Sequence, residues 1–228
     1  MIFPSLDRVK AIAPGYDIVP VYMEILSDVR TPISVLKALK QVSSHTYLLE
    51  SADNSNHWGR YSFLGYDPKI ELFCKNHKMT IKDGTTRTFE CSDPAAEIRN
   101  ILSQYKSPRL EELPTFTGGF VGYFACEYIR YIESTLDFPT PDDDSAMVND
   151  VDLMLFDKVI AFDHYKNKIY LIANISTNDL ECNYNKAELE LKALADLVVN
   201  GKEADVPKGI LKTEFTSEFT KDEFEAVV

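Results

Sequence analysis

The residues best suited to recognise a small molecule lie in the stretch 47–67, YLLESADNSNHWGRYSFLGYD. Two apolar, strand-like pieces flank a polar segment that starts with Glu50 and Ser51. A carboxylate can bind an ammonium group, a hydroxyl can hold a second polar group, and apolar neighbours can contact a side chain. The stretch therefore has the chemistry to bind a small zwitterion, although spacing alone favours a solvated hairpin loop with a capping serine.

A second unusual stretch, GGFVGY at 118–123, places three glycines among large apolar residues. This pattern indicates a strand that another backbone approaches closely. The alternative is a phosphate-binding loop, but the strand–loop–helix context with Lys-Ser/Thr is missing. We therefore place this stretch within a sheet.

Spacing gives no support to other kinds of chemistry. The four cysteines are far apart, the four histidines are dispersed, and the acidic run at 142–144 lacks the alternating ligands of a calcium loop. Ser51 has no His or Asp at a spacing that would activate a nucleophile. We predict no catalytic and no metal-binding residue in this chain.

The composition is that of an acidic globular protein. The chain has 228 residues, of which 45% are hydrophobic and 26% charged, and its net charge is −12. This length suits one large domain or two small ones, and the negative charge disfavours nucleic acid and anionic membranes as partners. The sequence shows no signal-peptide pattern and no apolar run near membrane-spanning length. Few cysteines in a chain of this size predict reduced thiols and a cytoplasmic protein.

Hydrophobic periodicity predicts strands in antiparallel hairpins with helices beside them. We expect an α+β fold: an antiparallel meander, or half of a sandwich, with flanking helices. The expected strands are 18–26, 47–49, 61–66, 70–75, 78–82, 85–90, 151–162 and 168–175, and the expected helices are 6–12, 33–42, 95–105, 126–133 and 184–199.

The pattern of the last residues predicts one more helix. Thr220 and Glu223 fit a capping box, and Phe219 and Phe224 fit the hydrophobic staple around it. A helix of about two turns is marginal by itself. We therefore expect the chain to be the front part of a longer protein, with a domain over 1–200 and a linker and truncated first helix of a further domain over 201–228.

Six segments, in order along nearly the whole chain, resemble the N-terminal region of the anthranilate synthase component I family. They are PVYMEI at 20–25, LLESAD at 48–53, WGRYSFLGYDP at 58–68, FTGGFVGYFACEYIRYIE at 116–133, FDKVIAFDH at 156–164 and FTSEFTKDEF at 215–224. LLES followed closely by GRYSFLG is a fairly specific feature.

The resemblance implies a fragment of a two-domain, chorismate-utilising fold. In that family ammonia adds to magnesium-bound chorismate and pyruvate is eliminated, so the enzyme is a lyase. The chorismate pocket, the Mg²⁺ ligands and the catalytic residues belong to the C-terminal domain. We therefore expect this chain alone to be inactive and to hold no cofactor.

The resemblance also implies a feedback site for L-tryptophan between the two domains. The matching positions are Leu49, Glu50, Ser51 and Tyr61. Glu50 would face the ammonium group, Ser51 would hold a polar group, and Leu49 would contact the indole. Implied partners are the chain's own C-terminal chorismate-binding domain and a glutamine amidotransferase subunit that supplies ammonia. A half-site loses most of its enclosure, so the isolated chain should bind tryptophan weakly.

Two alternatives stay open at this point. The related component I of aminodeoxychorismate synthase shares the architecture and the glycine-rich stretch, but its bound tryptophan can be structural. A free-standing amino-acid sensor with no catalytic partner is a different class of protein.

Overall fold

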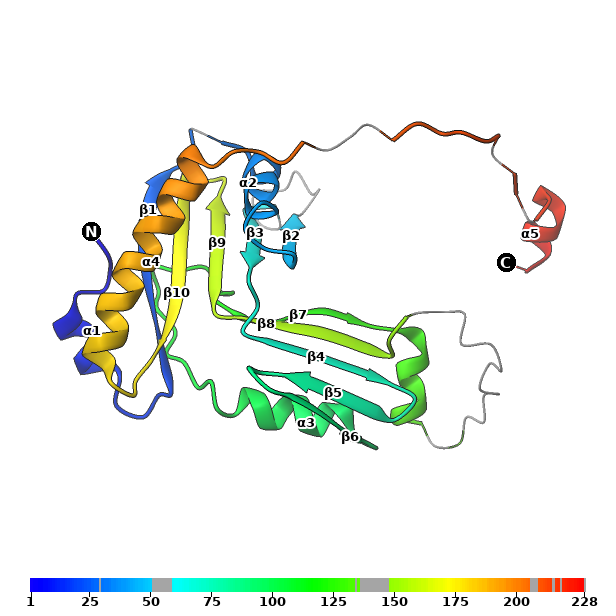
Figure 1. Ribbon diagram of the computed structural model, residues 1–228, viewed down its shortest axis with the longest axis horizontal. Coiled ribbons are helices and arrows are strands. Elements are labelled where there is room, and N and C mark those ends of the chain that lie inside the picture. The colour runs from blue at the N-terminus through cyan, green and yellow to red at the C-terminus, as the bar shows by residue number, and fades with distance from the viewer. Residues whose placement is uncertain are drawn as a thin grey trace.

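Two antiparallel sheets of five strands each organise the described residues of the computed structural model (Figure 1). The structure describes residues 1–28, 30–50, 59–133, 135, 148–205, 209–214, 216–217 and 219–227. Every strand pair within these two sheets is antiparallel. The predicted α+β class, with antiparallel strands and flanking helices, is confirmed.

The first sheet has the strand order β1-β10-β9-β3-β2. Its strands are β1 (Ile18–Leu26), β10 (Lys168–Ser176), β9 (Lys158–Asp163), β3 (Tyr61–Tyr66) and β2 (Thr46–Glu50). The edge position of β1 accommodates its Pro20, which has no N–H to donate.

Both faces of this first sheet are covered. Against one face pack the helices α1 (Leu6–Ile12), α2 (Pro32–Leu39) and α4 (Leu180–Asn200). In Figure 1, α4 runs alongside β1 and β10. Against the opposite face lies a segment that contributes Leu110, Leu113 and Phe116. The central strands β9 and β10 are consequently buried almost continuously along their length.

The second sheet has the order β6-β5-β4-β8-β7. Its strands are β6 (Thr86–Glu90), β5 (Lys78–Lys82), β4 (Ile70–Lys75), β8 (Val151–Phe156) and β7 (Gly119–Phe124). The helix α3 (Pro94–Leu102) and the 3₁₀ helix η1 (Cys126–Tyr131) contribute to its core. Burial alternates along β4 and β5, which is the pattern of a sheet with one packed face.

The glycine-rich stretch lies in β7, as predicted. A Cβ on Gly122 would overlap the backbone carbonyl of Asp152 in the paired strand β8. The close backbone approach inferred from the sequence is therefore present.

The prediction of one strand over 151–162 is wrong. The chain breaks at Asp157 into β8 and β9, which belong to different sheets. The chain also passes from the first sheet to the second between β3 and β4, which pair with β9 and β8. Asp67, with a positive φ of 53°, lies at this second break. Lys158 Nζ lies 3.5 Å from Asp67 Oδ2. No glycine or proline marks the break, so the continuous apolar run conceals it.

The helix boundaries follow local signals. Thr31 accepts a hydrogen bond from the backbone N–H of Ser34, and Asp93 accepts one from Ala96, as expected of N-caps. The predicted capping box is also present, because Thr220 and Glu223 bond reciprocally at the start of α5 (Lys221–Val227). The helix expected over 184–199 begins four residues earlier, at Leu180. The proposed division into domains at residue 200 stays a prediction.

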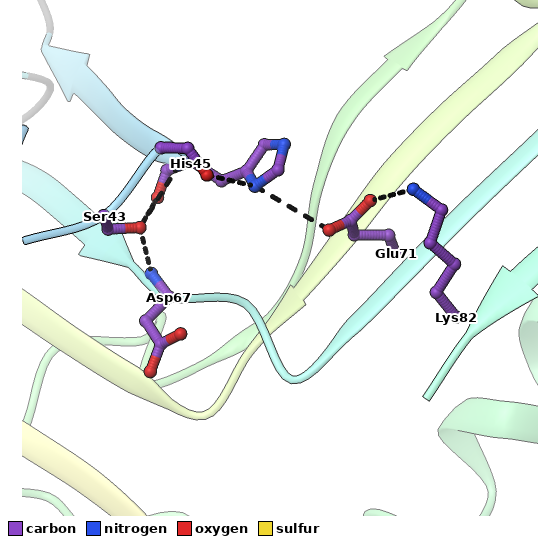
Figure 2. Close-up of polar contacts among 6 residues, drawn as sticks. Ser43, His45, Asp67, Glu71 and Lys82 are labelled. Atoms are coloured by element: carbon purple, nitrogen blue, oxygen red, sulfur yellow. Dashed lines mark hydrogen bonds and ion pairs between the residues drawn. The ribbon is translucent and has the colours of Figure 1, made fainter. Parts of the chain in front are cut away.

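Polar contacts join the two sheets beside the Asp67 bend (Figure 2). Ser43 Oγ accepts the backbone N–H of Asp67 at 3.0 Å and donates to the carbonyl of His45 at 2.8 Å. His45 Nδ1 lies 3.7 Å from Glu71 Oε1 of β4, and Lys82 of β5 donates to Glu71 Oε2 at 2.9 Å. The approach to β2 is thereby tied to the second sheet.

Two further predictions concern the whole chain. All four cysteines are free thiols, as predicted. Among the described residues, none of the helices combines the length and apolar character that a membrane crossing requires.

Candidate functional site

The candidate site lies at the outer edge of the first sheet, where β2 pairs with β3 (Figure 1). Leu49 and Glu50 are the last two residues of β2, and Tyr61 is the first residue of β3. Glu50 lies opposite Ser62, and Leu49 lies opposite Phe63. Ser51, the remaining predicted site residue, lies outside the described residues.

Strand alternation divides the predicted residues between two faces. Leu49, Tyr61 and Phe63 share one face, because directly paired residues and residues two apart point the same way. Glu50 and Ser62 point to the other face, toward the side covered by α2 and α4. A ligand that contacts both Leu49 and Glu50 must therefore lie across the end of β2.

The Leu49 face offers an aromatic surface. The rings of Tyr61 and Phe63 are stacked, with centroids 5.7 Å apart and planes inclined by 30°, and Phe116 meets Phe63 edge-on. Leu49 is 47% exposed, which is high for a leucine in a strand. This surface can contact an apolar or aromatic side chain of a ligand.

The Glu50 face carries a chain of polar contacts that the sequence did not reveal. Ser62 Oγ lies 3.3 Å from Glu50 Oε1 and 2.7 Å from His164 Nε2. Ser62 is only 1% exposed, whereas Glu50 is exposed. The sequence does place Ser62 between two aromatic residues in an apolar strand. Because a buried hydroxyl requires a hydrogen-bond partner, this pattern could have indicated a polar contact here.

An ion pair between the buried Asp163 and the partly exposed Arg60 anchors the neighbouring turn. Arg60 donates to Asp163 twice, from Nε to Oδ1 at 3.1 Å and from Nη2 to Oδ2 at 2.7 Å. Asp163 is fully buried and also accepts the backbone N–H groups of Tyr165 and Lys166. Burial alone would raise the pKa of the Asp163 carboxyl, but the hydrogen bonds from Arg60 and the backbone outweigh it and hold the pKa below its usual value.

The same arginine borders the aromatic surface. The Arg60 guanidinium lies 4.8 Å from the centroid of the Tyr61 ring and 5.5 Å from that of Tyr165. Burial raises the pKa of the Tyr61 hydroxyl, and the nearby Asp163 charge adds to the effect. Tyr61 therefore presents a neutral phenol beside a fixed cation.

These groups are arranged for binding rather than for hydrolysis. The carboxylate of Glu50 contacts the serine hydroxyl instead of the second ring nitrogen of His164, and Ser62 is buried. A serine nucleophile needs an exposed oxygen and a base oriented by a third group. The described residues contain no group of three or more His, Cys, Asp or Glu that could hold a metal ion.

Two cavities lie elsewhere, near the junction of the sheets. One of about 250 Å³ is polar and includes Lys69, Lys158 and Lys186 together with Asp157 and Glu190 in its lining. A smaller one of about 100 Å³ lies beside Gly118 and Gly119. Leu49, Glu50 and Tyr61 line neither of them.

Comparison with known proteins gives a consistent set of relatives. Residues 45–228 match the family described as chorismate binding enzyme. The chain is 33% identical to anthranilate synthase component 1 of Acetivibrio thermocellus over 98% of this chain and 46% of that protein. It is 38% identical to the Acinetobacter calcoaceticus protein of the same name, over 81% of this chain and 37% of that protein.

The chain thus spans a little under half the length of the curated relatives it matches. A crystal structure of anthranilate synthase component I from Streptococcus pneumoniae also matches, with 26% identity and a TM-score of 0.44 over 74% of this chain and 36% of that chain.

Proposed function

Because this chain belongs to the family of chorismate binding enzymes, we propose that it forms the N-terminal part of component I of an anthranilate synthase. The similarity to anthranilate synthase component 1 over 98% of the chain carries this proposal. The full-length enzyme would convert chorismate and glutamine to anthranilate, pyruvate and glutamate. It would be a lyase of tryptophan biosynthesis, in the cytoplasm, where the free cysteines would stay reduced.

Catalysis would require parts beyond this chain. The described residues offer no metal cluster, so they do not fit a magnesium site, and we assign the Mg²⁺ ligands and the chorismate pocket to a C-terminal chorismate-binding domain. A glutamine amidotransferase subunit would supply ammonia. This chain alone would produce no anthranilate.

The first test is enzymatic. The full-length protein, with its amidotransferase partner, should form fluorescent anthranilate from chorismate and glutamine, and this chain alone should not. Formation of p-aminobenzoate precursors in place of anthranilate would favour the aminodeoxychorismate alternative. Tight tryptophan binding by this chain alone, measured by calorimetry, would favour the free-standing sensor.

The role of the candidate site would be feedback inhibition by L-tryptophan. Glu50 would bind the ammonium group at the end of β2, and Leu49 and Tyr61 would contact the indole on the adjoining face, with Ser51 as a further polar contact. Tryptophan would favour a domain arrangement unsuited to catalysis, and the two sites would be coupled reciprocally. What supports this role is the exposed carboxylate at the end of β2, across the strand end from an aromatic surface on the opposite face.

A matched pair of variants tests this role. In the full-length enzyme, Glu50→Gln should weaken tryptophan inhibition by about tenfold, because it removes a charge-assisted hydrogen bond. Glu90→Gln changes another exposed glutamate at a strand end, on β6, and should leave inhibition unchanged. Ser51→Phe should also weaken inhibition. Equal inhibition of all four proteins would remove Glu50 and Ser51 from the site.

A further inference from the structure

We infer that Ser62 and His164 are positioning residues for Glu50, which hold its carboxylate where a ligand's ammonium group can reach it. The inference rests on the proposed tryptophan site and adds residues to it that touch no ligand themselves. It comes from a continuous line of contacts: Glu50 Oε1 to Ser62 Oγ at 3.3 Å, and Ser62 Oγ to His164 Nε2 at 2.7 Å.

The three residues come from three adjacent places in the sheet. Glu50 ends β2, Ser62 lies opposite it in β3, and His164 follows the last residue of β9. Ser62 pairs with Phe162 in β9, so residues 62, 162 and 164 share one face. Ser62 is buried, whereas Glu50 and His164 at the two ends of the line are exposed, so the buried hydroxyl connects two solvent-accessible side chains.

The proton count gives this line a direction. A hydroxyl carries one hydrogen, so Ser62 can donate to Glu50 only if it receives a hydrogen bond from His164. His164 must then carry a hydrogen on Nε2. In the tautomer with the hydrogen on Nδ1 alone, Nε2 would accept the Ser62 hydrogen and the carboxylate would lose its donor. Any residue that replaces His164 must therefore place a hydrogen-bond donor where Nε2 lies, within reach of Ser62 Oγ.

Hydrogen bonds hold the backbone around His164, while its side chain is exposed. Its backbone N–H donates to the carbonyl of Arg60 at 2.9 Å. The preceding Asp163 is fixed by the two hydrogen bonds from Arg60, and the His164 ring lies nearly parallel to that of Phe162 at a centroid distance of 6.4 Å. These contacts fix the backbone at residue 164, from which the exposed imidazole reaches Ser62 Oγ.

A fixed carboxylate matters for affinity. A glutamate at an exposed strand end samples several rotamers, and a ligand that needs one of them must order the side chain as it binds. The contact with Ser62 restricts Glu50 before the ligand arrives. Loss of that contact should weaken tryptophan binding by about tenfold, within the range of a hydrogen bond to a charged group.

The experiment measures the tryptophan inhibition constant of the full-length enzyme, together with kcat and KM for chorismate in the absence of tryptophan. Ser62→Ala and His164→Leu should each raise the inhibition constant by about tenfold. His164→Gln, whose side-chain amide keeps a donor, should recover most of the inhibition. Thr80→Ala removes a similar cross-strand hydroxyl contact, 3.0 Å from Thr88 in the second sheet, and should have no effect.

A double-variant cycle separates positioning from packing. If Ser62 acts through Glu50, adding Ser62→Ala to Glu50→Gln should weaken inhibition by less than about twofold beyond Glu50→Gln alone. Additive effects, or equal losses in His164→Leu and His164→Gln, would overturn the inference. Should His164→Leu fail to fold, the Ser62→Ala cycle decides alone.

Different results would overturn the proposed tryptophan site and the positioning role of Ser62 and His164. A wild-type enzyme that tryptophan does not inhibit would overturn the regulatory site and, with it, this inference. An enzyme that tryptophan inhibits through Glu50, but whose inhibition Ser62→Ala leaves unchanged, would overturn the inference alone.

Discussion

The two sheets differ in the burial of their polar side chains. In the first sheet, β9 and β10 are buried on both faces, and the buried polar residues among the described ones, Ser62 and Asp163, both belong to this sheet. In the second sheet, β4 and β5 alternate, and their polar contacts, such as Glu71 with Lys82, lie at the surface. A polar side chain on a doubly covered sheet must have a partner, whereas one on a half-exposed sheet needs none.

This difference explains why the candidate site lies where it does. The buried polar groups of the first sheet converge on the β2–β3–β9 edge, beside Glu50 and Tyr61. In the second sheet, contacts such as that of Lys82 with Glu71 reach solvent. Four measurements test whether the two sheets differ in this way.

The largest effect is expected for Asp163→Ala in the first sheet. The substitution leaves Arg60 without its partner and two backbone N–H groups without an acceptor, so it should reduce the free energy of unfolding by about 3 kcal/mol. Urea denaturation measures the change. A loss below about 1 kcal/mol would place Asp163 with the exposed pairs of the second sheet.

The second effect compares two tight glycines, one in each sheet. Gly122→Ala in β7 would meet the immovable carbonyl of Asp152, while Gly65→Ala in β3 would meet the Tyr47 ring, which can shift. We expect Gly122→Ala to cost about 3 kcal/mol of unfolding free energy and Gly65→Ala about 1–2 kcal/mol. Gly209→Ala, with open space around it, is the control. The reverse order would show that the first sheet tolerates crowding less.

The third effect concerns pH. The pKa of Asp163 is lowered in the folded protein, so its stabilising contribution is present above the unfolded value of about 3.9 and is lost as the pH falls through the folded pKa. Wild type should therefore lose more stability than Asp163→Asn as the pH falls below about 4. Denaturation of both proteins at each pH gives the difference in their unfolding free energies, in which the contributions of the carboxylates they share cancel. Parallel curves would contradict the assignment.

The smallest effect is expected at the junction shown in Figure 2. Glu71→Gln weakens the contacts to His45 and Lys82, but all three side chains reach solvent, with Glu71 26% exposed. The unfolding free energy should change by less than about 1 kcal/mol, and less still in 1 M salt. A larger, salt-independent loss would mean that polar contacts at this junction matter as much as those at the Glu50 edge.

Local signals in the sequence predicted much of the fold. The N-caps and the capping box can be predicted from the sequence because each depends on residues only three positions apart. They lie at Thr31, Asp93 and Thr220. The strands of the second sheet follow in the same way, because alternation reflects one packed face.

The candidate site was only partly predictable. The stretch containing Leu49, Glu50 and Tyr61 does form the paired ends of β2 and β3. The predicted strand 47–49 did not include Glu50, whereas β2 extends to Glu50 and so places it on the opposite face from Leu49. Ser62 and His164 were missed, because 102 residues separate them and only the pairing of β3 with β9 brings them together.

By itself, the sequence determined the elements, the antiparallel class and the family resemblance, since these depend on near neighbours along the chain. The tertiary structure decided where the run 151–162 breaks between two sheets, which strands lie side by side, and which buried polar groups meet. The physical reason is that burial on both faces erases the alternation that would mark a strand's orientation. The partners of Ser62 and Asp163 are then set by packing among distant segments.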